Sequence, residues 1–211
     1  MKPSGNRMRT NPLHAILEQW NIILFSALAA GLLATVFSFL TPLQYSSSVR
    51  VLITQPGTAG LDPYTVLKAT ESIANSLTQL IYSSTFFTNV IQQNASVDPT
   101  YFPQDELNKR RLWRRTLDVS VTPSTGILTL TAYHPSREQA RGLVEGAARE
   151  MALQAPNYFG TSVRIQVIDA PLDSRWFARP RFVSNAALGF FIGALLGTAW
   201  ILSRKPSRHE I

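Results

Sequence analysis

The sequence predicts an α+β domain carried between two membrane-spanning helices. Two apolar runs without a charged residue, at 20–40 and 183–202, flank a polar segment at 41–182. Each run holds about 20 residues, and an α-helix of that length, rising about 1.5 Å per residue, crosses a hydrocarbon core of about 30 Å. Strand-like and helix-like periodicities alternate within the polar segment, which is typical of an α+β domain.

The two tails, residues 1–19 and 203–211, are net basic, which predicts that both lie in the cytoplasm and that 41–182 lies outside. Their charged residues are Lys2, Arg7, Arg9 and Glu18, and Arg204, Lys205, Arg208 and Glu210. A signal peptide cleaved at Ala27-Leu28-Ala29 is the alternative. We expect an uncleaved anchor instead, because the apolar run continues for 11 residues past Ala29.

The charge balance argues against nucleic-acid binding. The chain has a net charge of +7, but six of its 20 Lys and Arg and two of its 13 Asp and Glu lie in the tails. The central segment therefore holds 14 basic against 11 acidic residues, without the strong basic excess of a nucleic-acid binder. The absence of cysteine excludes disulfides, thiolate metal sites and a cysteine nucleophile.

The first half of the central segment predicts one strand and two helices. Residues 45–53, YSSSVRVLI, place alternate residues on one face, as in a strand. Asp62 and Pro63 form a helix start, and apolar residues at three- and four-residue spacing continue the helix to Tyr82. Ser84 is expected to cap a second short helix, whose apolar face is Phe86, Phe87, Val90 and Ile91.

A polar loop at 94–103 and a short charged helix at 104–115 come next. Asp105 and Glu106 lie four residues before Lys109 and Arg110, which is the favourable order for ion pairs on a helix. Strands at 117–122 and 127–133, joined by Pro-Ser-Thr-Gly, then predict a hairpin.

Ser136 and Gln139 form a capping box before the last helix of the domain. The apolar stripe of this helix is Ala140, Leu143, Val144, Ala147, Ala148 and Met151, and a strand at 162–169 follows it. The resulting order, β-α-(α)-β-β-α-β, predicts a ferredoxin-like domain with helices on one face of a mainly antiparallel sheet.

No constellation of residues supports catalysis, so we expect neither an enzyme nor a cofactor or metal site. The three histidines, His14, His134 and His209, are far apart, and phosphate-binding, nucleophile-elbow and zincin motifs are missing from the sequence. The adjacent carboxylates Asp105 and Glu106 point apart on a helix.

Two basic clusters are candidate contact surfaces. The first is expected mainly to be the solvated face of a helix; the alternative is contact with an anionic glycan, a lipid headgroup or an acidic face of another subunit. It consists of Lys109, Arg110, Arg111, Arg114 and Arg115. The second precedes the second span and resembles an interfacial anchor, with arginines at lipid phosphates and an aromatic ring at headgroup level. It consists of Arg175, Trp176, Arg179 and Arg181.

Small residues predict close packing by the spans. Gly189, Gly193 and Gly197 recur every four residues on one face of the second span, and Gly31 lies on a small-residue face of the first. The partner of the glycine face is left open between the first span, another subunit and another protein.

Taken in order, these segments resemble the chain-length determinant (Wzz-type) family, the polysaccharide co-polymerases of bacterial inner membranes. The resemblance rests on a basic start, a first span ending in Thr41-Pro42, and a glycine-rich second span preceded by Pro171 and Pro180. The sequences that carry the rest of it are YSSSVRVLI, IYSSTFFTNVI, YHPSREQARGLVEGAAREM and VIDAPLD.

The resemblance implies a non-enzymatic homo-oligomer of the inner membrane that sets the length, polymerisation or export of O-antigen, capsule or exopolysaccharide. Its implied partners are copies of itself, a polymerase or export machinery, membrane lipids and a separate cytoplasmic tyrosine kinase. The chain departs from typical members in its smaller outer part and in the spacing of its prolines, which are nine residues apart. A two-span sensor, or an adaptor for a kinase, remains the alternative.

Overall fold

A computed structural model describes residues 17–55, 62–94, 96–160 and 163–203. The chain divides into two compact units: a span unit formed by Met1–Pro42 and Pro180–Ile211, and an outer unit, Leu43–Arg179. The basic residues of both predicted tails, together with His14 and His209, lie outside the described residues.

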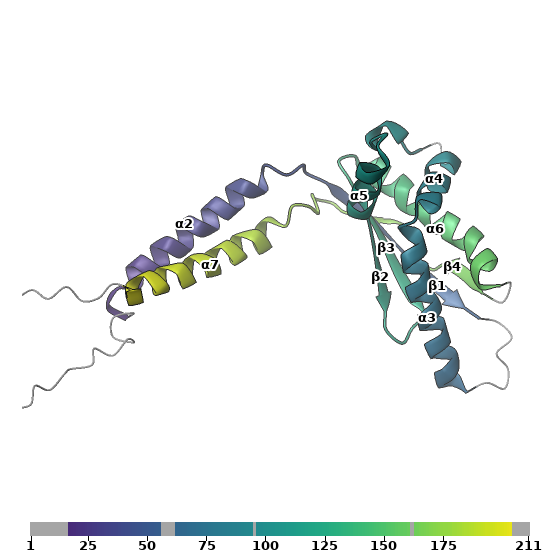
Figure 1. The fold of residues 1–211 in the computed structure, drawn as a ribbon, viewed down its shortest axis with the longest axis horizontal. Helices are drawn as coiled ribbons and strands as arrows, with labels where there is room; N and C mark the ends of the chain where they lie inside the picture. The colour runs from purple at the N-terminus through teal and green to yellow at the C-terminus, as the bar shows by residue number, and fades with distance from the viewer. Residues whose placement is uncertain (1–16, 56–61, 95, 161–162, 204–211) are drawn as a thin grey trace, which may run out of the picture. The chain divides into compact units, whose positions relative to one another are not determined.

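The span unit consists of two helices, α2 (Trp20–Ser38) and α7 (Phe182–Ser203), which lie side by side (Figure 1). Both are long and apolar enough to cross a membrane, as the sequence predicts. Only 17% and 22% of their most apolar windows are buried. A core helix of a soluble protein would be mostly buried, so the exposed apolar surface of this pair requires an apolar environment.

One antiparallel sheet organises the outer unit, in the strand order β2-β3-β1-β4. Its strands are β1 (Tyr45–Thr54), β2 (Leu117–Thr122), β3 (Ile127–His134), β4 (Arg164–Val167) and β5 (Leu172–Asp173). Val49 lies opposite Leu130 and Val51 opposite Leu128, so the buried residues of β1 and β3 share one face. The predicted β2–β3 hairpin is confirmed, and its loop turns at Gly126, whose φ is +67°.

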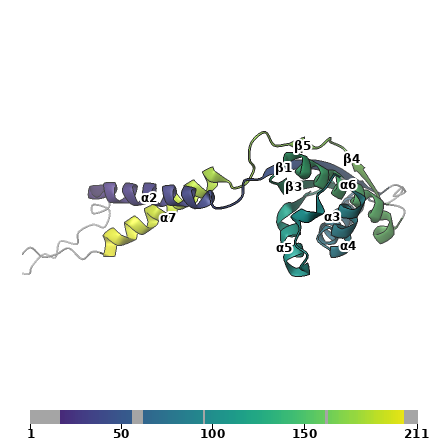
Figure 2. The ribbon, with the colours of Figure 1, turned by 90° about the horizontal axis from the view of Figure 1, so that it is seen from above.

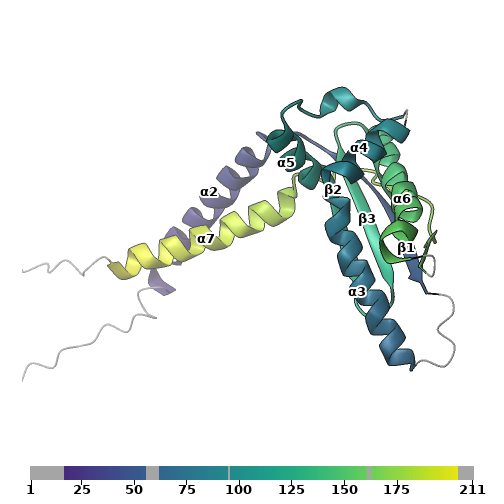
Figure 3. The ribbon, with the colours of Figure 1, turned by 45° about the vertical axis from the view of Figure 1, so that its right-hand side comes forward.

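Helices cover one face of this sheet, which Figure 2 shows from its edge. They are α3 (Pro63–Ile81), α4 (Ser84–Gln93), α5 (Glu106–Thr116) and α6 (Arg137–Phe159), with a 3-10 turn, η1 (Pro99–Tyr101). Helix α3 lies beside the hairpin (Figure 3), and Asp62 caps it by accepting from the Thr65 amide, as predicted.

The core lies between α6 and the sheet. The predicted stripe of α6 is buried throughout, with Leu143 and Val144 fully inaccessible. Trp113 of α5 closes the core beside α3, where its indole Nε1 donates to the Ile81 carbonyl over 2.8 Å. The indole therefore buries its ring without leaving its N–H unsatisfied.

Two predictions at helix starts need correction. Ser83, and not Ser84, caps α4 by accepting from the Phe86 amide. Asp105 caps α5 at the Asn108 amide, so only Glu106 makes the predicted i,i+4 pair, with Arg110 at 2.8 Å. Ser83 and Asp105 take these roles because a short polar side chain just before a helix accepts from a backbone amide that would otherwise be unpaired.

The capping box of α6 is only half formed. Ser136 accepts from the Gln139 amide, but its own amide donates to His134 Nδ1. The Gln139 side chain instead accepts from the Asp98 amide and donates to the Ser96 carbonyl. The Gln139 side chain thus bonds to the segment before α5, and not to the Ser136 amide as a complete capping box requires.

The predicted polar loop at 94–103 contributes to the core, contrary to its composition. Val97 and Phe102 are buried, and the Phe102 ring meets Phe87 edge-on at 4.9 Å between centroids. The last predicted strand, 162–169, is shorter than expected: β4 covers Arg164–Val167, and residue 162 lies outside the described residues.

Glu150 is a buried carboxylate between α4 and α6. Its Oε1 accepts from Asn89 Nδ2 over 2.6 Å and from Gln154 Nε2 over 3.0 Å, while Oε2 has no hydrogen-bond donor among the described residues. The two donors to Oε1, Asn89 and Gln154, therefore provide the hydrogen bonds that offset the cost of burying this carboxylate.

We expect Asn89→Ala to lower the free energy of unfolding by about 1–3 kcal/mol, because it removes a donor from a buried carboxylate. In a Glu150→Met background the same change should cost much less, since an apolar side chain needs no donor. Urea unfolding of the four variants measures this cycle, and an equal cost in both backgrounds would contradict it.

His134, at the end of β3, is buried against the Tyr101 ring, with centroids 4.2 Å apart. Burial holds its pKa below the ordinary value of 6.5, although the Asp98 carboxylate acts in the opposite direction. Its Nδ1 accepts from the Ser136 amide, as a neutral ring does when its proton is on Nε2.

The unfolded chain therefore binds a proton at His134 in a pH range where the folded chain does not, so stability should fall as the pH drops through 6.5. We expect His134→Asn, which keeps an acceptor but does not titrate, to reduce this loss. Melting temperatures between about pH 7.5 and about pH 5 test this, and parallel curves for both proteins would disprove it.

Candidate functional site

The three glycines of α7 lie directly against α2. A Cβ added at Gly189 would fall 2.6 Å from Ala34 Cβ, and one at Gly193 would fall 2.8 Å from Ala27 Cα. At Gly197 it would collide with the Ser26 hydroxyl. A side chain at Gly189 or Gly193 would meet the backbone of α2 and force the helices apart, and one at Gly197 would displace the Ser26 hydroxyl. The glycines therefore permit the close approach of the two helices.

Gly31 completes this contact from α2. A Cβ there would lie 3.3 Å from the Ala186 carbonyl oxygen, so it faces the first turns of α7. Of the three partners that the sequence leaves open for the glycine face, the structure places the first span there.

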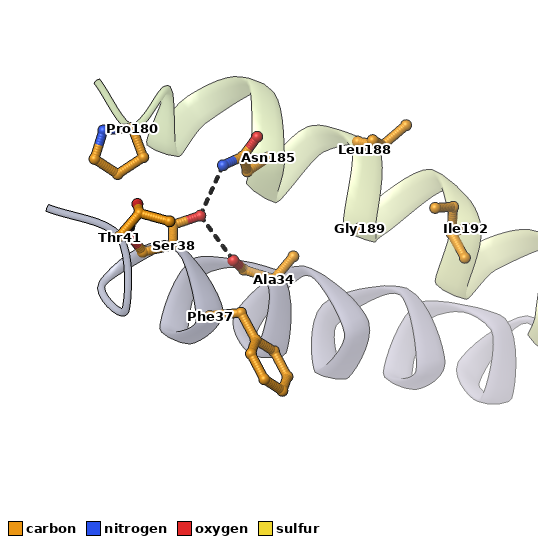
Figure 4. Close-up of a pocket in the computed structure, with 9 residues that line it drawn as sticks. All are labelled: Ala34, Phe37, Ser38, Thr41, Pro180, Asn185, Leu188, Gly189 and Ile192. Atoms are coloured by element: carbon orange, nitrogen blue, oxygen red, sulfur yellow. Dashed lines mark hydrogen bonds between the residues drawn. The ribbon is translucent and has the colours of Figure 1, made fainter. Parts of the chain in front are cut away.

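Hydrogen bonds join the helices at two levels. Ser26 Oγ donates to the Gly193 carbonyl over 2.6 Å. Nearer the outer unit in sequence, Asn185 Nδ2 donates to Ser38 Oγ over 2.8 Å, and Ser38 Oγ donates to the Ala34 carbonyl over 2.9 Å (Figure 4). In hydrocarbon these groups have no water as an alternative partner, which favours the paired state.

The Asn185 bond lies in a groove of about 370 Å³ between the two helices. Figure 4 shows its lining, to which Thr41 and Pro180 contribute beside the end of α2 and the start of α7. The contacts pair the end of α2 with the start of α7, so the helices are antiparallel, and the start of α2 lies at the same end of the pair as the end of α7.

The first basic cluster lies on α5 of the outer unit, and its members differ in surroundings. Arg110 and Lys109 pair with Glu106, at 2.8 and 3.5 Å. The Ser84 hydroxyl, followed by the Arg110 guanidinium, lowers the pKa of Glu106 to about 2. Arg111 is exposed, so the start of the helix is a partly neutralised, solvated surface.

The end of the same helix differs, because Arg114 and Arg115 have no carboxylate partner among the described residues. The Arg114 guanidinium lies over the Tyr82 ring at 5.3 Å, and the Arg115 carbonyl accepts from Arg179 Nη1 over 2.7 Å. The structure thus joins the second cluster, through Arg179, to the end of the first.

The members of the second cluster differ in their surroundings. Arg179 is half-buried over the Tyr133 ring, 3.4 Å from its centroid, whereas Arg175 and Trp176 are exposed. Arg181 belongs to the span unit, where its carbonyl accepts from the Asn185 amide over 3.0 Å.

The three membrane-proximal prolines also separate. Pro42 is exposed at the end of the span unit's first segment, and Pro180 lines the groove between α2 and α7. Pro171 is half-buried in the outer unit, one residue before β5.

The sequence did not single out Tyr45, Tyr133, Arg137 and Ser26 as site residues. Arg137 stacks over the Tyr45 ring at 4.8 Å and donates to the Arg175 carbonyl over 3.0 Å. Only the spacing of strands in three dimensions brings these partners together. For Ser26, a hydroxyl within an apolar run was the available signal.

Within the part of the chain that is described, no group of three or more His, Asp and Glu residues is arranged to hold a metal ion.

We expect Gly193→Leu to separate the two helices, whereas Ala199→Leu, at an exposed position of α7, should leave them paired. Since the chain has no cysteine, Ser38→Cys with Asn185→Cys supplies a specific reporter. The yield of the intramolecular disulfide after mild oxidation should fall with Gly193→Leu and stay unchanged with Ala199→Leu. An unchanged yield in both would refute the steric argument.

Comparison with known proteins identifies one family. Residues 13–94 match the model of the family described as Wzz, chain length determinant protein. The match covers α2, β1, α3 and α4, and ends one residue after α4. A search of curated proteins found no match.

Together, the family match and the two apolar helices indicate a membrane protein. The resemblance to the Wzz-type chain length determinant family, inferred above from the sequence, is confirmed by this match over residues 13–94.

Proposed function

We propose that the chain is a non-enzymatic membrane protein that regulates the chain length, polymerisation or export of a bacterial surface polysaccharide: O-antigen, capsule or exopolysaccharide. The observation that carries this proposal is the match of residues 13–94 to the chain length determinant family. The match gives the sensor alternative no support.

The proposed topology places both tails in the cytoplasm and the outer unit in the periplasm, with α2 and α7 crossing the inner membrane. The antiparallel pairing of the helices supports an even number of crossings. For the outer unit we propose a ferredoxin-like fold, supported by the order β2-β3-β1-β4 with every pair antiparallel.

The proposed partners are further copies of the chain, a polysaccharide polymerase or export machinery, and membrane lipids; a separate cytoplasmic tyrosine kinase is a further one. Regulation without catalysis would depend on where the outer unit holds its partners. Within the outer unit, the two segments that lead to the spans are hydrogen-bonded to each other. Gln44 donates its amide to the Arg179 carbonyl over 3.0 Å, and its carbonyl accepts from the Ala178 amide over 2.7 Å.

The pairing of α2 and α7 can be disturbed without unfolding the outer unit, because the outer unit has its own core. We therefore propose that the glycine contact is required for function.

Deleting the gene should change the length distribution or the amount of surface polysaccharide on a gel. Wild-type chain and Ala199→Leu should restore it, and Gly193→Leu should not, at equal protein levels. A deletion without effect on the polysaccharide would overturn the proposed function; restoration by Gly193→Leu would overturn only the role of the glycine contact.

A further inference from the structure

Four arginines from three separate segments gather where the chain enters and leaves the outer unit. We define this arginine collar as Arg115, Arg137, Arg175 and Arg179. Two hydrogen bonds to backbone hold it together: Arg179 donates to the Arg115 carbonyl, and Arg137 to the Arg175 carbonyl. Each bond brings one arginine to the backbone of another.

Two tyrosines fix the orientation of the collar. Arg137 lies over Tyr45, and Arg179 over Tyr133. Tyr45 pairs with His134 and Tyr133 with Ser46, so the two rings point to opposite faces of the sheet. The arginines therefore surround the strand ends, and do not form a patch on one face.

The collar has no internal counter-charge. None of its four guanidinium groups forms a salt bridge with a carboxylate among the described residues, although Arg50, Lys109, Arg110 and Arg141 all do so. Gathering like charges costs free energy unless an anion compensates them. An external anion would compensate these charges.

Chain connectivity keeps the collar near the membrane, whatever the orientation of the outer unit. Arg179 lies three residues before Phe182, where α7 begins, and three residues span at most about 11 Å. Trp176, between two collar residues, is 82% exposed, and Phe177 beside it stacks on Tyr45 at 4.6 Å. Exposed aromatic rings alternating with arginines are typical of headgroup depth.

We propose that the arginine collar binds the phosphates of anionic phospholipid headgroups around the span unit. Guanidinium groups bind phosphate through paired N–H donors. Arg137 and Arg179 each donate through one terminal nitrogen to a backbone carbonyl and keep their other N–H groups for an anion. Among the described residues, no hydrogen bond of this kind occupies the guanidinium groups of Arg115 and Arg175. This inference rests on the membrane topology proposed above and deepens the lipid partnership proposed there, because it assigns one lipid class to four named residues; a lack of lipid selectivity would leave the proposed regulation of polysaccharide untouched.

Arg115 and Arg175 allow a clean test, because only their backbone carbonyls take part in the hydrogen bonds that hold the collar. Arg115→Gln with Arg175→Gln removes two charges and leaves those bonds intact. The matched control, Arg149→Gln with Arg164→Gln, removes two exposed charges elsewhere on the outer unit, since Arg164 lies opposite Thr54 at the far end of β1.

Native mass spectrometry of the full chain in mild detergent, titrated with phosphatidylglycerol or phosphatidylcholine, gives the affinity for each lipid. We expect wild type and control to prefer phosphatidylglycerol, and the collar variant to bind it roughly 25-fold more weakly, at about fivefold per arginine. Affinity for phosphatidylcholine should not change in any of the proteins.

Equal phosphatidylglycerol affinity in wild type and collar variant, or an equal loss in the control, would overturn the proposal. Displacement of the lipid by inorganic phosphate would assign the collar to a soluble phosphate, and displacement by alginate at matched ionic strength would assign it to an anionic glycan. Either result would reject the lipid source.

Discussion

Strand β1 is the element on which the outer unit depends, because it pairs along both of its sides. β3 pairs with it over eight residues on one side, and β4 and β5 pair with it on the other. Its inward residues, Val49, Val51 and Ile53, are buried against α6. Since β1 begins seven residues after the end of α2, the strand at the centre of the sheet is also the one attached to the first span.

The span unit depends on a different constraint, the absence of side chains. Gly189, Gly193 and Gly197 allow α7 to approach the backbone of α2, and two hydrogen bonds then fix the register of the pair. Backbone segments thus come close together for different reasons in the two units: through ladder hydrogen bonds in the sheet of the outer unit, and through small residues in the helix pair of the span unit.

The sequence predicts the elements better than their partners. β1 and the stripe of α6 follow from periodicity, because burial imposes a period of 2 or 3.6. The two apolar helices follow instead from the length of their uncharged runs, and the hairpin from its short loop containing glycine. The core role of Val97 and Phe102 was missed, since an irregular loop has no period that marks an inward side chain. Competition for helix-start amides, and not ion pairing, decided the role of Asp105.

The arginine collar was equally beyond sequence reasoning. Arg115 and Arg179 are 64 residues apart, and Arg137 carries no signal that distinguishes it from any other arginine at the start of a helix. Their proximity follows from the pairing of Tyr45 with His134, which is a property of the sheet register and not of any local pattern.

The bonds between β1 and the returning segment have a mechanical consequence. Ile168, Ser174 and Ala178 donate in turn to Arg50, Ser46 and Gln44 along the strand. The segments that lead to the two helices leave this ladder at Gln44 and Arg179. A force that pulls these segments apart therefore loads the hydrogen bonds one after another, beginning at Gln44, and not all at once in shear. The ladder is weakest against a force in this direction. When such a force is applied through α2 and α7, it acts on the glycine contact between these helices before it acts on the hydrogen bonds of Gln44.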